Sequence, residues 1–131
     1  GQEHILLVDD EAQIAFMLKQ MLEQLGYRVT TRTSSLEALE VFAGQPDQFD
    51  LIITDQTMPN MTGDELATEA LLLRKGIPII ICTGFSEKIT EEAAKKKGIR
   101  AILMKPVLKQ QMAETIREVL KSEKQSRASK E

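Results

Sequence analysis

The sequence contains a single cysteine and no run of apolar residues that approaches the roughly 18 needed to cross a membrane. Cys82 has no second cysteine to pair with, and its position in the apolar run 77–82 indicates a small core residue. Excess basic charge is also absent, because the formal net charge is −3 at pH 7, so nucleic acid is not expected as a direct partner. No signal peptide precedes the first apolar segment. We therefore expect a cytoplasmic domain without direct membrane contact.

What is present is typical of one soluble globular domain. At 131 residues the chain can bury most of the apolar surface that it exposes when unfolded. Its content of 42% hydrophobic and 28% charged residues is ordinary for such a domain. The first residue is Gly1 rather than methionine, which suggests a piece cut from a longer protein or a processed start.

Short apolar segments alternate with segments of helical periodicity along the chain. Five of them have the length and composition of buried strands, namely residues 4–8, 27–32, 51–54, 77–82 and 99–104. Two of the helical segments open with capping boxes, Ser34-x-x-Glu37 and Thr62-x-x-Glu65. Five strands that alternate with five helices predict an α/β fold: a flavodoxin-like (βα)5 doubly wound parallel five-stranded sheet in the order 2-1-3-4-5.

Three parts of this pattern are less regular. The fourth helix, expected over residues 86–97, has only Ile89, Ala93 and Ala94 as apolar anchors and should be packed least firmly. His4, the only histidine, is expected at the exposed outer end of the first strand, without a functional role. Because residues 122–131 lack an apolar face, we expect the folded domain to span residues 1–121 and the rest to form a flexible tail or linker.

Acidic residues stand where two of the strands end. Asp9 and Asp10 follow the first strand, and Asp55 follows the third. In a parallel sheet of this order, strands one and three lie side by side at the switch point, and ligands bind at their carboxyl ends. The three carboxylates should therefore converge, and they repel one another unless a cation is present. Hard oxygen ligands at a hydrated edge suit Mg²⁺, which keeps several waters and binds through one or two carboxylates.

Two further polar residues occupy the ends of the last two strands. Thr83 follows the fourth strand and Lys105 follows the fifth. Each alone would be interpreted as a surface polar residue. Together with the acids they complete a site in which a carboxylate can act as a covalent nucleophile and form an aspartyl phosphate. A metal on one side, with the lysine and the hydroxyl on the other, would neutralise the phosphoryl oxygens.

The motifs that carry this site occur in a fixed order. They are Val8-Asp9-Asp10-Glu11, Asp55-x-x-Met58-Pro59-x-x-x-Gly63, Thr83-Gly84 and Lys105-Pro106. Each motif is weak alone, but in this order and spacing the set is highly specific. From Glu3 to about Leu120 the chain resembles the receiver domain of bacterial two-component response regulators. Segments 83–86 and 98–101 look similar to receivers attached to hybrid sensor histidine kinases.

The resemblance implies a phosphorelay role. Asp55 would accept a phosphoryl group from a histidine kinase or a histidine phosphotransfer domain. Asp10, Asp55 and the backbone carbonyl of Gln56 would bind Mg²⁺, and Asp9 would act largely through a metal-bound water. As an isolated domain, such a receiver is not an enzyme beyond its own phosphorylation and autodephosphorylation.

The resemblance also implies how the site responds. Lys105 would pair with the phosphoryl oxygens, and Thr83 would swing in to hydrogen-bond one of them. The Lys105–Pro106 peptide bond is expected to be cis, which is otherwise uncommon. One departure concerns the aromatic residue that usually lies three positions before the lysine and rotates with the threonine. Here that position is Ile102, which puts the usual relay in doubt but not phosphorylation itself.

Other functions fit the sequence less well. A phosphatase of the haloacid dehalogenase type also uses an aspartyl nucleophile and Mg²⁺, but it carries a second aspartate two residues later, where this chain has Thr57. A flavin-binding module of the same topology would need a phosphate-cradling loop after the first strand, and that loop is acidic here. A degenerate receiver that only binds partners is disfavoured because every chemical position is filled. We expect a monomer or weak dimer excised from a hybrid sensor kinase, with a stand-alone response regulator as the alternative.

Overall fold

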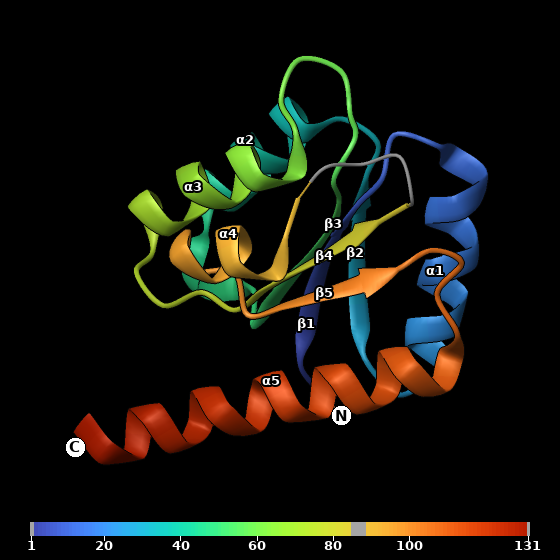
Figure 1. Cartoon of the computed structure of the whole chain (residues 1–131). Helices are drawn as coiled ribbons and strands as arrows, with labels where there is room; N and C mark the ends of the chain where they lie inside the picture. Colours follow the sequence, from blue (N-terminus) through green and yellow to red (C-terminus); the bar gives the residue numbers. More distant parts are fainter. Residues whose placement is uncertain (1, 85–88, 131) are drawn as a thin grey trace.

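Five parallel strands form the centre of the computed structural model, which describes residues 2–84 and 89–130, the last seven of these by backbone alone. The strands are β1 (His4–Val8), β2 (Arg28–Arg32), β3 (Leu51–Asp55), β4 (Ile79–Thr83) and β5 (Ala101–Met104). Their order in the sheet is β2-β1-β3-β4-β5, and each neighbouring pair is parallel. The predicted fold class and strand order are confirmed (Figure 1).

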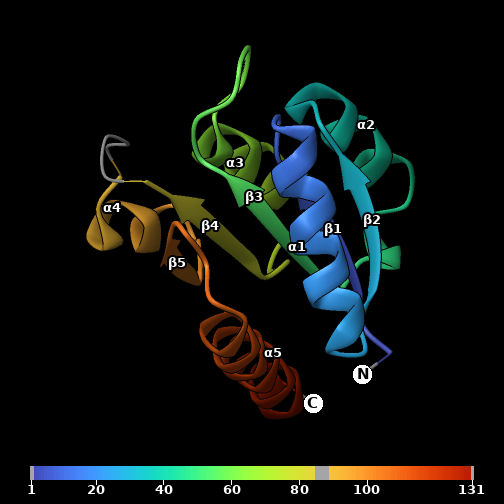
Figure 2. The ribbon, with the colours of Figure 1, turned by 90° about the vertical axis from the view of Figure 1, so that its right-hand side faces the viewer.

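Helices cover both faces of the sheet, as a doubly wound topology requires. They are α1 (Ala12–Gln24), α2 (Ser35–Gly44), α3 (Gly63–Leu73), α4 (Glu91–Lys96) and α5 (Lys109–Lys130), with a short 3₁₀ turn η1 (Pro46–Gln48) before β3. Helices α2, α3 and α4 pack on one face, and α1 and α5 pack on the other (Figures 1 and 2). None of the helices in the described part of the chain is both long enough and apolar enough to span a bilayer.

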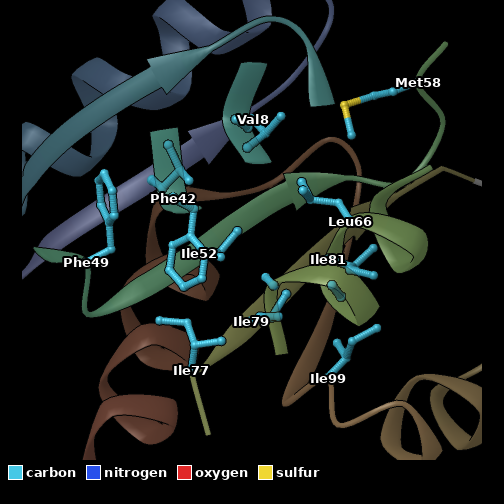
Figure 3. Close-up of a cluster of buried hydrophobic side chains, with 14 of the residues drawn as sticks. Val8, Phe42, Phe49, Ile52, Met58, Leu66, Ile77, Ile79, Ile81 and Ile99 are labelled. Carbon is cyan, nitrogen blue, oxygen red and sulfur yellow. The ribbon is translucent and has the colours of Figure 1, made fainter. Parts of the chain in front are cut away.

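The apolar core is divided by the sheet into two layers. Alternate residues of β1 point to opposite faces, so Leu6 and Val8 join one layer while Ile5 and Leu7 join the other. Figure 3 shows the layer beneath α2 and α3, where Phe42 and Phe49 lie over Ile52. Strands β1, β3 and β4 are buried along their whole length, whereas β2 at the edge is only partly buried. This rigid frame fixes where the strand ends lie.

The fourth helix is shorter than predicted. It begins at Glu91, where Thr90 caps it by accepting a hydrogen bond from the Ala93 backbone at 3.0 Å. The expected start at residues 86–88 lies outside the described residues. Ala94 is its one buried residue, which agrees with the expectation of few apolar anchors.

The prediction that His4 lies at an exposed strand end was wrong. The residue is buried, with 7% of its surface exposed. Its ring packs against the Phe49 ring, with 4.7 Å between the two ring centroids, and its Nε2 shares a hydrogen bond with Thr30 Oγ1 at 2.7 Å. Burial and the Arg28 charge lower the His4 pKa below its usual value, although Asp50 acts in the opposite direction. The start of β1, which was expected to be exposed to solvent, is therefore covered by Phe49 and Thr30.

The last helix is longer than predicted. Helix α5 continues through Lys130, whereas residues 122–131 were expected to form a flexible tail or linker. Besides three serines, the segment contains two lysines, two glutamates, an arginine, a glutamine and an alanine, which favour a helix even without an apolar face. Glu123 also pairs with Arg100 at 2.9 Å, so the helix is held to the domain beyond residue 121. Figure 1 shows the end of α5 running on past the strands.

Candidate functional site

The acidic residues converge at the carboxyl edge of the sheet. Val8 of β1 is paired with Thr54 of β3, so the residues that follow them, Asp9 and Asp55, lie at the same level on neighbouring strands. Asp10 comes next in the chain, and one carboxylate oxygen from each of the three acids lies within 4.8 Å of the others. The predicted grouping of these carboxylates is therefore present in the structure.

Two of the three carboxylates are buried. Asp9 is 1% exposed and Asp55 is 5% exposed, whereas Asp10 is open to solvent. The backbone amide of Glu11 donates to Asp9 Oδ1 at 2.9 Å and fixes that side chain. A site with two buried acids and one solvent-facing acid can hold a cation at its rim while water completes the coordination shell.

Lys105 brings the positive charge that the buried acids need. Its Nζ lies 2.7 Å from Asp55 Oδ1 and 3.4 Å from Asp9 Oδ2. Its backbone amide donates to the Thr83 carbonyl at 2.8 Å, which holds the end of β5 beside β4. Burial alone would lower the Lys105 pKa, but the hydrogen bond to Asp55 and the charges of both acids outweigh it and raise the pKa. The lysine therefore stays a cation, and its bond to Pro106 is cis as expected.

Thr83 ends β4 at the same edge and is only 3% exposed. Its hydroxyl donates to the neighbouring Gly84 carbonyl at 3.4 Å. In this structure the hydroxyl is thus engaged locally, and it would have to turn to reach a phosphoryl group. Residues 85–88, which follow Gly84 in the chain, lie outside the described part.

Gln56 is bound to the first turn of α3. Its backbone carbonyl accepts from the Gly63 amide at 2.8 Å, its Oε1 accepts from the Asp64 amide at 3.0 Å, and its Nε2 donates to Asp64 Oδ1 at 2.9 Å. Sequence reasoning named the Gln56 carbonyl but missed Asp64. The one sequence signal was Gly63 in the motif, which placed the start of a helix near the site.

Asp64 is strongly held as an anion. Burial would raise its pKa, but hydrogen bonds from Lys97, Thr62 and Gln56 lower it to about 2. Lys97 Nζ lies 2.7 Å from Asp64 Oδ2 and comes from the residue that ends α4. This pair could not be found from the sequence because its members are 33 positions apart, one in α3 and the other directly after α4.

The residues present fit Mg²⁺. Three carboxylates and one lysine leave two negative charges, which one divalent cation matches. The donors are hard oxygens, and the Gln56 carbonyl, though bonded to Gly63, retains a second lone pair. Asp10 and Asp55 each offer a carboxylate oxygen to this cluster, while the buried Asp9 is already held by the Glu11 amide and Lys105.

Ile102, which occupies the position where the resemblance implies an aromatic residue, lies on β5. It is partly buried and packs against the core layer under α4. It also lines a surface pocket of about 220 Å³ between α4 and β5, together with Ala94, Lys95 and Ile99. Space for a larger side chain therefore exists beside this position.

Comparison with known protein families identifies one match to most of the chain. The model of the response regulator receiver domain matches residues 5–117. Among individual relatives, the transcriptional regulatory protein GlrR of Escherichia coli strain K12 is 34% identical over 117 residues, which is 89% of this chain. The sensor kinase CckA of Brucella abortus is 28% identical over 123 residues. This chain spans 26% of the former and 13% of the latter, so most of each relative lies outside the comparison.

Solved structures show the same architecture. A response regulator receiver domain protein from Clostridium thermocellum superposes with a TM-score of 0.89 at 32% identity, covering 93% of this chain and 97% of that one. The chemotaxis protein CheY4 of Vibrio cholerae gives a TM-score of 0.79 at 31% identity, with coverage of 91% and 99%. The likeness thus extends over the whole of these domains and includes the strand ends where the acids lie.

Proposed function

Since this chain belongs to the response regulator receiver domain family, we propose that Asp55 is its phosphoacceptor in two-component signalling. The observation that carries the proposal is the position of Asp55 at the end of β3, among two further acids and 2.7 Å from Lys105 Nζ. A carboxylate in such surroundings is held in place and stays next to a cation that can stabilise an incoming phosphoryl group.

The reaction is a transfer from nitrogen to oxygen. A carboxylate oxygen of Asp55 forms a bond to phosphorus while the bond to the donor histidine breaks, and the electron pair returns to the imidazole. Lys105 Nζ, already beside Asp55 Oδ1, pairs with the negative phosphoryl oxygens. Thr83 turns from the Gly84 carbonyl to donate to one of them.

Mg²⁺ is the proposed cofactor. When bound, it neutralises phosphoryl oxygens and holds them near the nucleophile. Asp10, Asp55 and the backbone carbonyl of Gln56 would be direct ligands, and Asp9 would act mainly through a metal-bound water. Support comes from the acid cluster and from the family, whose members bind Mg²⁺ at such a pocket.

A histidine kinase or a histidine phosphotransfer domain is the proposed phosphodonor, in keeping with the family. The domain itself would carry out only its own phosphorylation and dephosphorylation. Turnover of small phosphate esters is not proposed, because Thr57 stands where a phosphatase with an aspartyl nucleophile carries its general acid.

The parent protein is a separate proposal. The relatives include both transcriptional regulators and a sensor kinase, and each is much longer than this chain. We favour a receiver that belongs to a hybrid sensor kinase, with a stand-alone response regulator as the alternative. The coding sequence on either side of this segment decides between them. A kinase core encoded upstream supports the hybrid kinase, whereas a start codon just before the segment and a stop codon just after it support the stand-alone regulator.

The direct test of Asp55 is phosphorylation by a small donor. With Mg²⁺ and acetyl phosphate, mass spectrometry should detect one added phosphoryl group, which hydroxylamine removes and which a metal chelator prevents from forming. Asp55→Asn should remain unlabelled, whereas Asp47→Asn, a change at an exposed acid in η1, should label normally. Equal labelling of Asp55→Asn and the unaltered protein would overturn the assignment.

A further inference from the structure

Gln56, the residue after the proposed phosphoacceptor, is fixed by hydrogen bonds from both its backbone and its side chain. The Gln56 amide donates to the Cys82 carbonyl of β4 at 3.0 Å, and the Gln56 carbonyl accepts from Gly63 at 2.8 Å. The side chain is 8% exposed and forms two reciprocal hydrogen bonds with Asp64, one to its backbone amide and one to its carboxylate. The orientation of the Gln56 peptide is therefore set by α3 as much as by the sheet.

Asp64 connects three elements of the structure. Its Oδ1 accepts from Gln56 Nε2 at 2.9 Å and from Thr62 Oγ1 at 2.5 Å, and its Oδ2 accepts from Lys97 Nζ at 2.7 Å. The side chain is only 18% exposed, so water competes weakly for these bonds. Both carboxylate oxygens are thus used in bonds that reach beyond α3.

A purely local role for Asp64 does not account for these contacts. The start of α3 is already capped by Glu65, whose Oε1 accepts from the Thr62 amide at 2.9 Å. An acid in the first turn also interacts favourably with the helix dipole, but Glu65 supplies that charge as well. What Asp64 alone adds is a fixed Gln56 and a tie to the end of α4.

Resting on the proposed function, we infer that Asp64 is a positioning residue for the phosphoryl and metal site. It acts through Gln56, whose backbone carbonyl is a proposed Mg²⁺ ligand, by fixing the side chain on the same residue. Lys97 supports this role by holding Asp64 in the orientation that faces Gln56. Groups that orient direct ligands commonly change metal affinity by tenfold or more when removed.

The test compares Mg²⁺ affinity among variants, measured by calorimetric titration well below the melting temperature of each. Asp64→Ala removes the acceptor for Gln56 Nε2 and should weaken Mg²⁺ binding by about tenfold. Asp64→Asn keeps an oxygen for Gln56 while losing the charge. It should therefore retain most of the affinity and match Glu65→Gln, in which a neighbouring acid of the same charge is neutralised. Equal losses in all three variants would show that Asp64 acts only through its charge, and would overturn the inference.

Gln56→Leu provides an independent test, and it also covers the case in which Asp64→Ala does not fold. This variant keeps the backbone carbonyl and removes only the side chain that Asp64 holds, so it should show the same loss as Asp64→Ala. Combining the two changes should weaken Mg²⁺ binding no more than either change alone, because both remove the same interaction between Gln56 and Asp64. Additive losses would contradict the inference. The proposed function itself is tested by Mg²⁺ binding and Asp55 labelling in the unaltered protein. If the unaltered protein binds Mg²⁺ and is labelled while the variants show no selective loss, only the role assigned to Asp64 fails.

Discussion

Gly63, the first residue of α3, lies directly against the backbone carbonyl of Asp55. A Cβ atom on Gly63 would overlap the Asp55 oxygen and would come within 3.1 Å of Gln56 Cα, both of them backbone atoms that cannot move aside alone. The same contact brings the Gly63 amide to the Gln56 carbonyl at 2.8 Å. Glycine is thus required here for space, and the requirement falls on the strand end that carries the proposed nucleophile.

Replacing this glycine should disturb fold and site together. Gly63→Ala should lower the free energy of unfolding by about 3 kcal/mol, because α3 has to move away from the end of β3. Gly44→Ala is the matched control, since a Cβ there meets no atom within 4 Å and alanine favours the helix, so its stability should be unchanged or slightly higher. Urea denaturation measures both. Similar stabilities for the two variants would show that the contact with Asp55 is not tight.

Removing the solvent-facing acid should separate metal binding from stability. Asp10→Asn should reduce Mg²⁺ affinity more than tenfold because a direct ligand is lost. A tenfold change corresponds to about 1.4 kcal/mol of binding free energy. The metal-free protein should become more stable, because one of three repelling carboxylates is gone. Thermal melts with and without Mg²⁺ report both effects. Glu11→Gln, at the next exposed acid, controls for charge alone, and an unchanged metal-induced shift in Asp10→Asn would contradict the assignment.

The part of this site that could be predicted is the part that topology fixes. Once the strands were identified, their parallel order placed Asp9, Asp55, Thr83 and Lys105 at one edge, whatever the details of packing. The link from Gln56 through Asp64 to Lys97 could not be predicted in this way. It depends on how two helices lie against each other, which no spacing in the sequence encodes.

Burial of His4 was missed for a related reason. A strand end is open or covered according to what packs on it, and here Phe49, 45 residues later, supplies the cover. The extent of α5 was missed because an apolar face was taken as the requirement for a helix. Helix formers and the pair between Arg100 and Glu123 continue it without one.

Replacing the site lysine should affect cation and phosphoryl binding in opposite directions. Lys105→Met removes a positive charge close to two acids, so Mg²⁺ should bind at least about fivefold more tightly, since two unit charges about 4 Å apart in water already interact by about 1 kcal/mol. Beryllofluoride, an anion that mimics the phosphoryl group, should bind more weakly because its cationic partner, the Lys105 ammonium group, is lost. Lys109→Met, a change at an exposed lysine bonded to Gln24, should alter neither. A parallel loss or gain of both ligands in Lys105→Met would oppose the proposed division of roles.

His4 should make the stability of the domain depend on pH. Its pKa in the folded protein is lowered from 6.5 by burial and by Arg28, so the unfolded chain binds the proton more readily. The stability that the neutral ring provides is therefore complete above pH 6.5 and is lost as the pH falls toward the lowered pKa. Unfolding free energies should therefore decline as the pH falls below about 6.5, before the pH reaches the range where carboxylates titrate. In His4→Gln this decline should disappear, and an equal decline in that variant would assign it to other groups.

Ile102 should confine the response to phosphorylation near Thr83. The resemblance to receiver domains implies that movement of Thr83 toward Asp55 would vacate space for a rotating ring, which would carry the change to the face formed by α4 and β5. Isoleucine is smaller, lacks a hydroxyl and is stiff at its first torsion, so it cannot follow in that way. With beryllofluoride bound, NMR shifts should be large at Thr83 and Gly84, and at the start of α4, and small at the Ile102 methyl groups. Our expectation that the change extends to Phe85 concerns residues outside the described structure.

Restoring the aromatic side chain tests the same idea from the other side. Ile102→Tyr should use the pocket of about 220 Å³ between α4 and β5, and its ring should then respond to the state of Thr83. Chemical shifts on β5 and on the α4 residues that line this pocket, Glu91, Ala94 and Lys95, should change with beryllofluoride in the variant more than in the unaltered protein. If the Ile102 methyl shifts in the unaltered protein already match those around Thr83 in size, the relay operates without its aromatic residue and the confinement does not exist.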